Sequence, residues 1–487
     1  MLSRSYLPPA ADPPLLAYSP MLHARLFAET EKYRRANFHP TTPSSTPGSE
    51  PAPYLDGNAS LDRPLFVQFC ANDPNYLLAA AKKVAPYCDA VDLNLGCPQG
   101  IARKGHYGAF LQEDQALIHK LVKALHDELD VPVTAKIRVL DTPEATLAYA
   151  RNVLDAGASI LTVHGRRREQ KGHLTGLADW EAIRHLRDNL PPETVLFANG
   201  NVLEHGDLER VLAATGADAV MTAEGNLSNP AIFATAPAEG AGGREYWRGR
   251  DGHGGWRVDG IMRRYLDILH KYVAGVDPPA RRPLFVPGDD TAWLDEAKAA
   301  VEDEEEGPAR KKRKQEVGKG KDMVQSVNFV AMQPHMFHLL RHFVTEHTDV
   351  RDILARSRKG DLEAYEKVLR LVEIKVAEGL LAYEKDKAGK GQTEEGIAPE
   401  EDIDEELKGE SSTAALRRCK RPWWVAQPII RPLPKEALAK GSVKISKKVK
   451  AAMGITGAEV EESLKEVEKG DGNGLSDKTM IEEKVAG

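Results

Sequence analysis

Short apolar runs alternate with amphipathic stretches over the first half of the chain, from Leu15 to about Phe233. Runs of this length, rich in β-branched residues, are typical of strands buried in a parallel sheet. They predict seven strands, at Leu16–Ser19, Leu65–Phe69, Ala90–Leu95, Val133–Ile137, Ile160–His164, Val195–Ala198 and Ala219–Thr222. Helical spacing between them predicts helices at Asp114–Glu128, Glu144–Ala156, Trp180–Asn189 and Gly206–Thr215. This order indicates repeated βα units of the (β/α)8 barrel (TIM-type) class.

The hydrophobic pattern changes after Phe233. Helical spacing recurs at 261–273, 324–345, 350–355 and 362–378, with no convincing strand among these segments, and predicts a small helical domain. Residues 277–322 include an acidic and then basic run, EDEEEGPARKKRK. We expect this segment to be a solvated insertion that lies outside the helical core.

These changes divide the chain into four parts. We expect a disordered N-terminus at 1–14, a barrel domain at 15–240, a helical domain at 241–380 and a mostly disordered, charged tail at 381–487. A segment rich in Ser, Thr, Pro and Gly, 40–60, interrupts the barrel as a long loop. In the tail, only Arg421–Pro432 has the apolar content to pack.

Composition narrows the class of protein. A net charge of -7 over 487 residues gives no global signature of nucleic-acid binding, so any RNA surface must be local. The four cysteines lack metal-ligand spacing, so we expect no metal site. We find no signal peptide and no apolar stretch of about 18 residues, and we expect a cytoplasmic monomer without membrane contact. The basic run Arg310–Lys314 fits a nuclear-localisation signal, an RNA-contacting arm or a solvated charge block.

Polar residues follow almost every predicted strand. In a parallel barrel the active site lies at the carboxyl ends of the strands, so these residues share one rim. A rim with this many polar groups in succession is typical of a ligand site. The residues are Gln68, Asn94, Lys136, Arg138, His164, Arg166, Asn199, Gly200, Asn201, Glu224 and Gly225.

One segment, Ala90–Leu111 with the sequence AVDLNLGCPQGIARKGHYGAFL, joins a strand to a loop that carries Cys97 and several glycines. The glycines allow the loop to move over the rim. A thiol on such a loop can deliver a proton to a substrate that lies on a cofactor. Cys97 is therefore the candidate general acid.

Other segments indicate the type of cofactor. TAKIRV and LTVHGR place cation-capable side chains at the rim, where they suit an anionic flavin edge or a phosphate. FANGN and MTAEGN end the last two strands with small residues, whose backbone N–H groups suit a phosphate. FMN fits better than FAD or NAD, because no GxGxxG follows a first strand.

The run of segments VQFCANDP, DLNLGCPQGIARKGHYGAFL, TAKIRV, LTVHGRRREQKGHLTG, FANGNV and VMTAEGNLSNPAIF resembles the tRNA-dihydrouridine synthases. It is most similar to the eukaryotic subgroup that acts on uridines 16 and 17 of the D-loop. The resemblance covers about Leu16 to Phe233. It implies FMN-dependent reduction of the uracil C5–C6 double bond, with NADPH as reductant and tRNA as partner.

The resemblance also implies roles for single residues. Cys97 would protonate uracil C5 while reduced flavin delivers hydride to C6. Asn94 would contact the uracil, and Arg138 would face the RNA. The implied FMN positions are Gln68, Lys136, His164, Asn199, Gly200, Asn201, Ala223 and Glu224. The helical domain would grip tRNA through 333–358.

The start of the chain departs from the family pattern. The family barrel opens with a strand ending in Ala-Pro-Met under the flavin, whereas Ala17–Phe27 matches the family's second strand. The proline-rich residues before it cannot supply a further βα unit. We therefore expect a barrel that lacks its first βα unit. The sequence is either an incomplete version of an enzyme, with about 30–40 further residues encoded upstream, or an open barrel with weakened FMN binding.

Two other functions remain open at this point. Another FMN barrel reductase, acting on free pyrimidines or dihydroorotate, would place similar groups near its flavin. A helical domain with a basic surface favours a folded RNA over a free base. A flavin-poor protein that only binds tRNA is the second alternative, and the intact Cys97 and FMN positions argue against it.

Overall fold

The structure is a computed structural model. It describes residues 1–8, 14–42, 51–172, 175–241, 243–249, 254–306, 326–388 and 421–429. The basic run Arg310–Lys314, Cys419 and most of the predicted tail lie outside the described residues.

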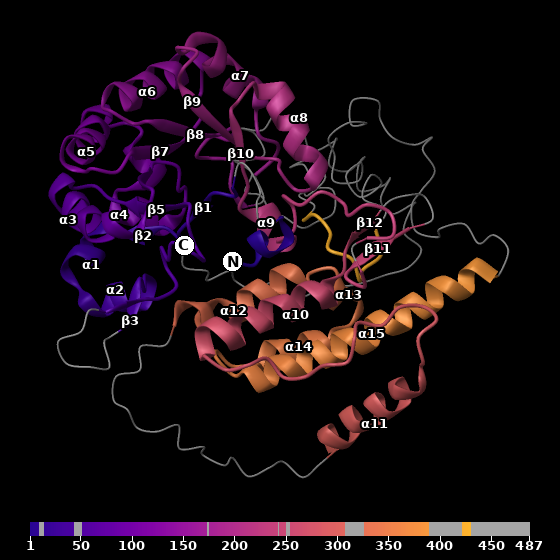
Figure 1. Cartoon of the computed structure of the whole chain (residues 1–487). Helices are drawn as coiled ribbons and strands as arrows, with labels where there is room; N and C mark the ends of the chain where they lie inside the picture. The colour runs from indigo at the N-terminus through magenta and orange to yellow at the C-terminus, as the bar shows by residue number, and fades with distance from the viewer. Residues whose placement is uncertain are drawn as a thin grey trace, which may run out of the picture.

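A curled parallel sheet forms the first unit (Figure 1). Its strands are β1 (Ala17–Tyr18), β2 (Leu22–His23), β5 (Leu65–Cys70), β6 (Ala90–Asn94), β7 (Val133–Arg138), β8 (Ile160–His164), β9 (Val195–Asn199) and β10 (Ala219–Met221). β1 and β2 pair with opposite ends of β5, so the sheet has seven positions, and the seven predicted strands are confirmed. Among the described residues β1 and β10 do not pair, so the sheet is an open half-barrel.

Helices cover the outer face of the sheet. They are α3 (Pro74–Val84), α5 (Gln115–Glu128), α6 (Pro143–Asp155), α7 (Trp180–Asn189) and α8 (His205–Thr215), with α1 (Ala24–Glu29) and α2 (Glu31–Asn37) beside β2. Asp114, Thr142 and Asp179 cap α5, α6 and α7, because each side chain accepts a backbone N–H of the first turn. Aliphatic side chains from the sheet and these helices form one continuous core. The short helices α4 (Gly100–Gly105) and α9 (Glu224–Ser228) follow the carboxyl ends of β6 and β10.

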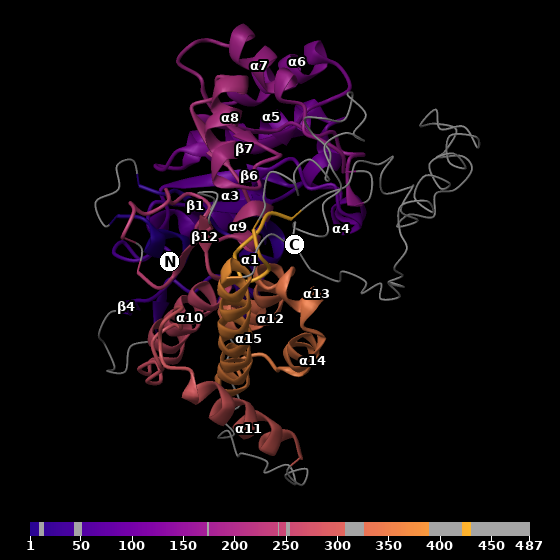
Figure 2. The same ribbon diagram turned by 90° about the vertical axis from the view of Figure 1, so that its right-hand side faces the viewer.

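A helical domain lies against the open side of the sheet (Figures 1 and 2). Its elements are α10 (Val258–Ile268), the π-helix Leu269–Ala274, α12 (Val327–Leu339), α13 (Phe343–Glu346), α14 (Thr348–Arg356) and α15 (Leu362–Ala388). Their apolar faces form a second core that is separate from the core of the sheet. The predicted helical domain is therefore present in this part of the chain.

Two expectations for the second half were wrong. A hairpin of β11 (Tyr246–Arg248) and β12 (Gly254–Trp256) precedes α10, and its strands are too short to show periodicity. The described part of the 277–322 segment is not a solvated insertion. Phe285 and Leu294 are buried in the helical core, Leu284 is buried beside them in sequence, and α11 (Ala292–Glu306) follows from the same segment. Abundant Pro and acidic residues mask these few apolar anchors in the sequence.

The expectation of a disordered 1–14 was also wrong for residues 1–8. A 3-10 helix, Ser3–Tyr6, packs at the junction of the two units, where Tyr6 is buried. In 40–60, β3 (Thr41–Thr42) pairs with β4 (Ala52–Pro53), while 43–50 lies outside the described residues. Contacts with other segments hold both: Arg4 and Tyr6 bind distant residues, and Tyr54 N donates to the Pro40 carbonyl. Such contacts leave no periodic signal in the sequence.

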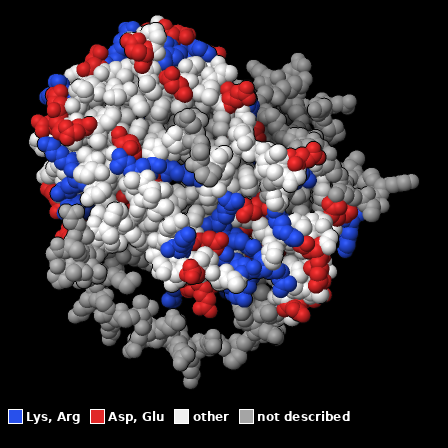
Figure 3. Space-filling view, viewed as in Figure 1, with Lys and Arg blue, Asp and Glu red and all other residues white. Residues whose placement is uncertain are grey.

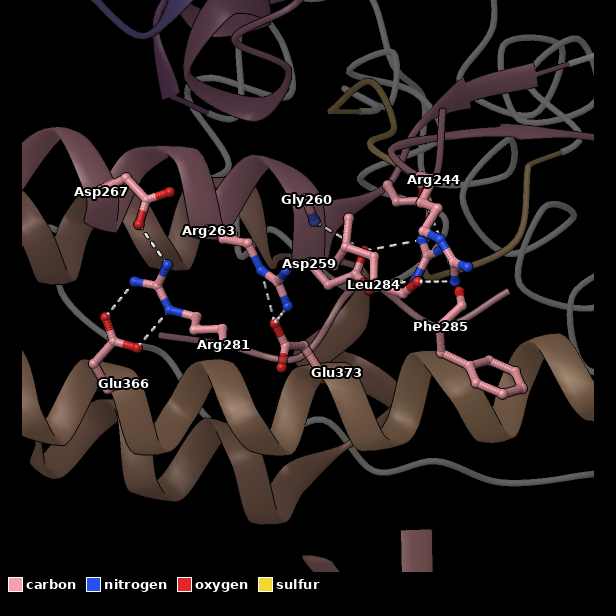
Figure 4. Close-up of polar contacts among 11 residues, drawn as sticks. Arg244, Asp259, Gly260, Arg263, Asp267, Arg281, Leu284, Phe285, Glu366 and Glu373 are labelled. Carbon is pink, nitrogen blue, oxygen red and sulfur yellow. Dashed lines mark hydrogen bonds and ion pairs between the residues drawn. The ribbon is translucent and has the colours of Figure 1, made fainter. Parts of the chain in front are cut away.

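Buried charges in the helical domain are paired (Figure 4). Arg257 donates through Nε and Nη2 to Asp259 at 3.0 and 2.6 Å, and both side chains are almost fully buried. Arg263 binds Glu373, and Arg281 binds Glu366 and Asp267, so these pairs join α10 and the 281–285 segment to α15. Burial raises the pKa of Glu373 to about 7, although Arg263 acts in the opposite direction.

Candidate active site

The sheet register brings the predicted rim residues together. Asn94 on β6 lies beside Lys136 on β7. One row further along, Arg138 lies beside His164, and His164 beside Asn199. Parallel strands place all of these side chains at the same edge of the sheet, as their positions in the sequence predict.

A hydrogen-bonded chain runs from the sheet interior to Cys97. Asp92 is fully buried and accepts from Thr134 Oγ1 at 2.6 Å and from Gln68 Nε2 at 2.8 Å. Gln68 Oε1 accepts from Asn94 Nδ2 at 2.8 Å, and Asn94 Oδ1 accepts from the Cys97 backbone N–H at 2.9 Å. Burial raises the pKa of Asp92. Asn94, predicted to contact uracil, thus uses its amide to orient the Cys97 loop.

The backbone around Cys97 is fixed on every side. Arg138 Nε donates to the Gly96 carbonyl at 2.7 Å, and Lys171 Nζ donates to the Pro98 carbonyl at 2.6 Å. The Cys97 carbonyl accepts from Ala109 N at 3.1 Å. Gly108 has φ +64°, and a Cβ there would lie 2.8 Å from the Cys97 oxygen, so this position requires glycine. The Cys97 residue itself remains partly exposed.

Arg138 was predicted to face the RNA. The structure places it as a buried bridge between two loops, because Nη1 also donates to the Arg167 carbonyl at 2.9 Å. Burial lowers the pKa of Arg138 to about 10. Its predicted contact with substrate stays a prediction.

Lys136 is a cation at the rim. Among the described residues no hydrogen bond or ion pair engages its ammonium group, and the oxygens of the nearby Asp92 already accept from Gln68 and Thr134. Burial, and after it the charge of Arg138, lowers the pKa of Lys136 to about 8. A cation in this position suits an anionic group of a ligand.

His164 is held as a neutral donor. Its Nε2 lies 3.2 Å from Arg166 Nη1, and a guanidinium only donates, so Nε2 accepts and Nδ1 carries the proton. Burial, followed by the charges of Lys136, Arg138 and Arg166, lowers the pKa of His164 well below its usual range. The imidazole is therefore neutral, with its proton on Nδ1.

The turn after β9 comes close to His164. Gly200 has φ +112°, and a Cβ there would lie 2.6 Å from Ala178 Cβ and 3.1 Å from the His164 ring. Asn201 also has a positive φ of 59°, and its Oδ1 accepts from Arg166 Nη2 at 2.6 Å. Asn199 Nδ2 donates to the Met221 carbonyl at 2.8 Å, which ties β9 to β10.

Ala223 and Glu224 begin α9 directly after β10. All predicted FMN positions therefore lie at the carboxyl ends of β5 and β7 to β10 or in the turns that follow them. Sequence reasoning did not single out Asp92 or Lys171 for this site. Asp92 at an interior strand position carried a signal, because a carboxylate in an apolar strand requires buried partners. Lys171 in a charged loop carried none.

These groups fit a flavin nucleotide. The Lys136 cation suits an anionic ring edge or phosphate. The glycine at position 200 lets this turn pack against Ala178 and the His164 ring at the same rim. Gln68 and Asn199, by contrast, have polar atoms already engaged within the protein. Among the described residues, no group of His, Cys, Asp and Glu could hold a metal, and no helix is long and apolar enough to cross a membrane.

The fold and the rim together define an α/β half-barrel with a thiol and a cluster of cations at the carboxyl ends of its strands. Residues 10–245 match the family model described as dihydrouridine synthase. A Saccharomyces cerevisiae protein named tRNA-dihydrouridine(16/17) synthase [NAD(P)(+)] is 43% identical over 420 residues, which cover 86% of this chain and 78% of that protein. A Schizosaccharomyces pombe protein of the same name is 39% identical, over 86% of this chain and 82% of that protein. The chain belongs to the dihydrouridine synthase family.

Solved structures are less similar. A dihydroorotate dehydrogenase (DHODH) from Eimeria tenella, in complex with ferulenol, is 16% identical with a TM-score of 0.29. The alignment covers 36% of this chain and 57% of that one, and this likeness carries no argument about function.

Proposed function

We propose that this chain is a tRNA-dihydrouridine synthase that reduces uridines 16 and 17 of the D-loop. The observation that carries the proposal is the Cys97 thiol, which is fixed at the rim close to the unpaired Lys136 cation. The two yeast relatives with this name support the choice of substrate, because the similarity includes the helical domain as well as the sheet.

Cys97 is the general acid of the proposed reaction, and its thiol proton goes to uracil C5. Asn94, Arg138 and Lys171 hold the loop so that this proton is delivered from one position. Such positioning matters because proton transfer requires hydrogen-bond distance between the acid and the reacting carbon.

FMN fits the rim as the cofactor. When bound, it would supply the hydride that adds to uracil C6, with NADPH as the final reductant. The Lys136 ammonium would hold an anionic part of the flavin, His164 Nδ1–H would donate to it, and the turn at Gly200 would lie against it. The hydride and the Cys97 proton together saturate the C5–C6 bond.

The helical domain is the tRNA platform of this proposal. Lys and Arg side chains, with acids between them, gather over this domain and its junction with the sheet unit in the face shown in Figure 3. Basic side chains near the rim fit the phosphates of a folded RNA, which a free pyrimidine would not need. The 333–358 region is the proposed contact.

The direct test supplies the purified full chain and NADPH with unmodified tRNA, free uridine or orotate. Bound flavin is measured by its absorbance, and dihydrouridine by mass spectrometry at each position of the tRNA. We expect a yellow protein that reduces positions 16 and 17 and leaves the free pyrimidines unchanged. Reduction of a free pyrimidine without tRNA would favour the other reductase class, and tRNA binding by a colourless protein would contradict the enzyme.

A further inference from the structure

Residues 1–8 link the two units of the molecule. On the sheet side, Arg4 Nη2 donates to the carbonyls of Leu15 at 3.0 Å and Pro64 at 2.7 Å. Ser3 Oγ donates to Asn226 Oδ1 in α9 at 2.8 Å, which connects the far edge of the sheet. This segment therefore contacts both edges of the open half-barrel.

The same segment contacts the helical domain two residues later. The Ser5 carbonyl accepts from Arg264 Nη1 at 2.6 Å, and the Arg264 guanidinium lies 4.3 Å from the centre of the Tyr6 ring. Tyr6 also packs edge-on against Trp256 at 4.6 Å. Tyr6 is thus held between α10 and the β11–β12 hairpin.

Residues 421–429, which come far later in the chain, reach the same hairpin, and Arg421 Nη2 also lies 4.0 Å from Glu204 Oε2 at the start of α8 in the sheet unit. The Trp424 carbonyl accepts from Val258 N, and Ala426 N donates to the Trp256 carbonyl, both at 2.9 Å. Trp423 packs on His347 at 4.4 Å and on Phe343 at 5.2 Å, so this segment also holds α13. In Figure 1 the yellow segment runs beside β12.

Two glycines show how closely residues 421–429 are seated. A Cβ on Gly255 would lie 2.5 Å from Val425 Cγ1, and a Cβ on Gly379 of α15 would lie 2.7 Å from the Trp424 ring. Neither glycine has a positive φ, so the packing of this segment, and not backbone conformation, requires a glycine at these positions. A segment held only loosely would leave room for a methyl group.

We propose that residues 1–8 and 421–429 form a brace that fixes the helical domain relative to Cys97 and so positions the tRNA uridine at the rim. This inference rests on the proposed function. Both segments meet at Trp256, which receives Tyr6 on its ring and Ala426 on its carbonyl. If the helical domain binds the tRNA and the sheet unit carries the reacting groups, the distance between the two units must be fixed. A misplacement of the uridine by about 1 Å can lower the rate up to about 100-fold.

The test compares Gly255→Ala, Val425→Ala and the double variant in the full chain. The added methyl group displaces Val425, and truncation of Val425 restores the space. Gly206→Ala is the matched control, because its Cβ meets nothing within 4 Å. We expect Gly255→Ala to lower kcat/KM for tRNA about 10-fold, and the double variant to recover most of this loss. Flavin content and flavin reduction by NADPH should match wild type in all variants.

Thermal unfolding separates positioning from stability. If Gly255→Ala lowers Tm while kcat/KM for tRNA stays at the wild-type value, or if the double variant recovers Tm alone, the brace only stabilises the fold and the proposal is wrong. Should Gly255→Ala fail to fold, Arg264→Gln is the second variant, because it weakens the contacts of residues 1–8 with the helical domain. We again expect a lower kcat/KM for tRNA with unchanged flavin content and flavin reduction. If the wild-type protein forms no dihydrouridine in tRNA, the proposed function is wrong, and the brace proposal fails with it. If wild type is active and only the variant comparison fails, the brace proposal alone is wrong.

Discussion

The rim of the sheet and the core of the helical domain use charge in opposite ways. In the helical domain Arg257, Arg263 and Arg281 each meet a carboxylate, and the Arg257–Asp259 pair is almost fully buried. At the rim, Lys136 has no carboxylate partner within hydrogen-bond distance among the described residues, and the neighbouring Arg138 is also a cation. Paired charges hold a structure together, whereas an unpaired cation costs folding free energy unless a ligand compensates it.

This contrast predicts which residues stabilise the protein and which act on a ligand. Variants at the rim should change binding or turnover with little loss of stability. Variants in the helical pairs should lower stability and leave the rim chemistry intact.

The largest expected effect is on turnover, from Cys97→Ala. We expect dihydrouridine formation to fall about 10²–10⁴-fold, because the general acid is lost, while flavin content and tRNA affinity stay unchanged. Single-turnover assays on matched tRNA measure the loss. Cys88→Ala is the control, since Cys88 is buried at the opposite end of β6. Equal turnover by the Cys97 and Cys88 variants would remove Cys97 from the mechanism.

Asp259→Asn should lower the free energy of unfolding by about 3–5 kcal/mol, because Arg257 stays buried without its counter-charge. Denaturant unfolding measures the change. Asp352→Asn, in an exposed pair with Arg351, should cost no more than about 1 kcal/mol. If Asp259→Asn and Asp352→Asn lower the free energy of unfolding by the same small amount, the buried ion pairs of the helical domain do not stabilise it.

Lys136→Met should weaken flavin binding about 10- to 100-fold, which is the range expected for the loss of a charged hydrogen bond. The flavin-free variant should be at least as stable as wild type near pH 7, because an uncompensated charge has been removed. Flavin content and Tm of the flavin-free protein are the two measurements, with Lys123→Met as the exposed control. Undiminished flavin content would place the anionic group elsewhere.

The smallest effect is the pH dependence of flavin binding. The pKa of Lys136 is lowered to about 8, so the free protein loses this cation as the pH rises through that value. Flavin affinity should fall by no more than about tenfold by pH 9, and the fall should be absent in Lys136→Met. The stability of the flavin-free protein should change in the opposite direction. Its free energy of unfolding should rise between about pH 8 and 10.5, because the folded protein loses the buried charge of Lys136 before the unfolded chain does. Parallel pH profiles for wild type and variant would contradict this assignment.

Some features could be predicted from the sequence because they depend on local pattern. Ile160–His164 is the strand as predicted, and the other strands differ from the prediction by a residue or two at their ends. Since parallel strands align their carboxyl ends, the rim residues and the loop of Cys97 also followed from the order of residues.

Other features depended on contacts between distant segments. Tyr6, Phe285 and Leu294 are isolated apolar side chains that fit into the helical core, and such isolated positions have no period. The bridging role of Arg138 required the Gly96 and Arg167 carbonyls, which come from two different loops.

The sequence by itself determined the family pattern, the parallel strands and the residues at their carboxyl ends, because strand periodicity and motif spacing are written locally along the chain. Only the tertiary structure decided which cations have a carboxylate partner, as Arg257 has, and which lacks one among the described residues, as Lys136 does. It also decided that residues 1–8 and 421–429 meet at Trp256. The physical reason is that pairing and burial depend on distances between segments far apart in sequence, and no local pattern encodes those distances.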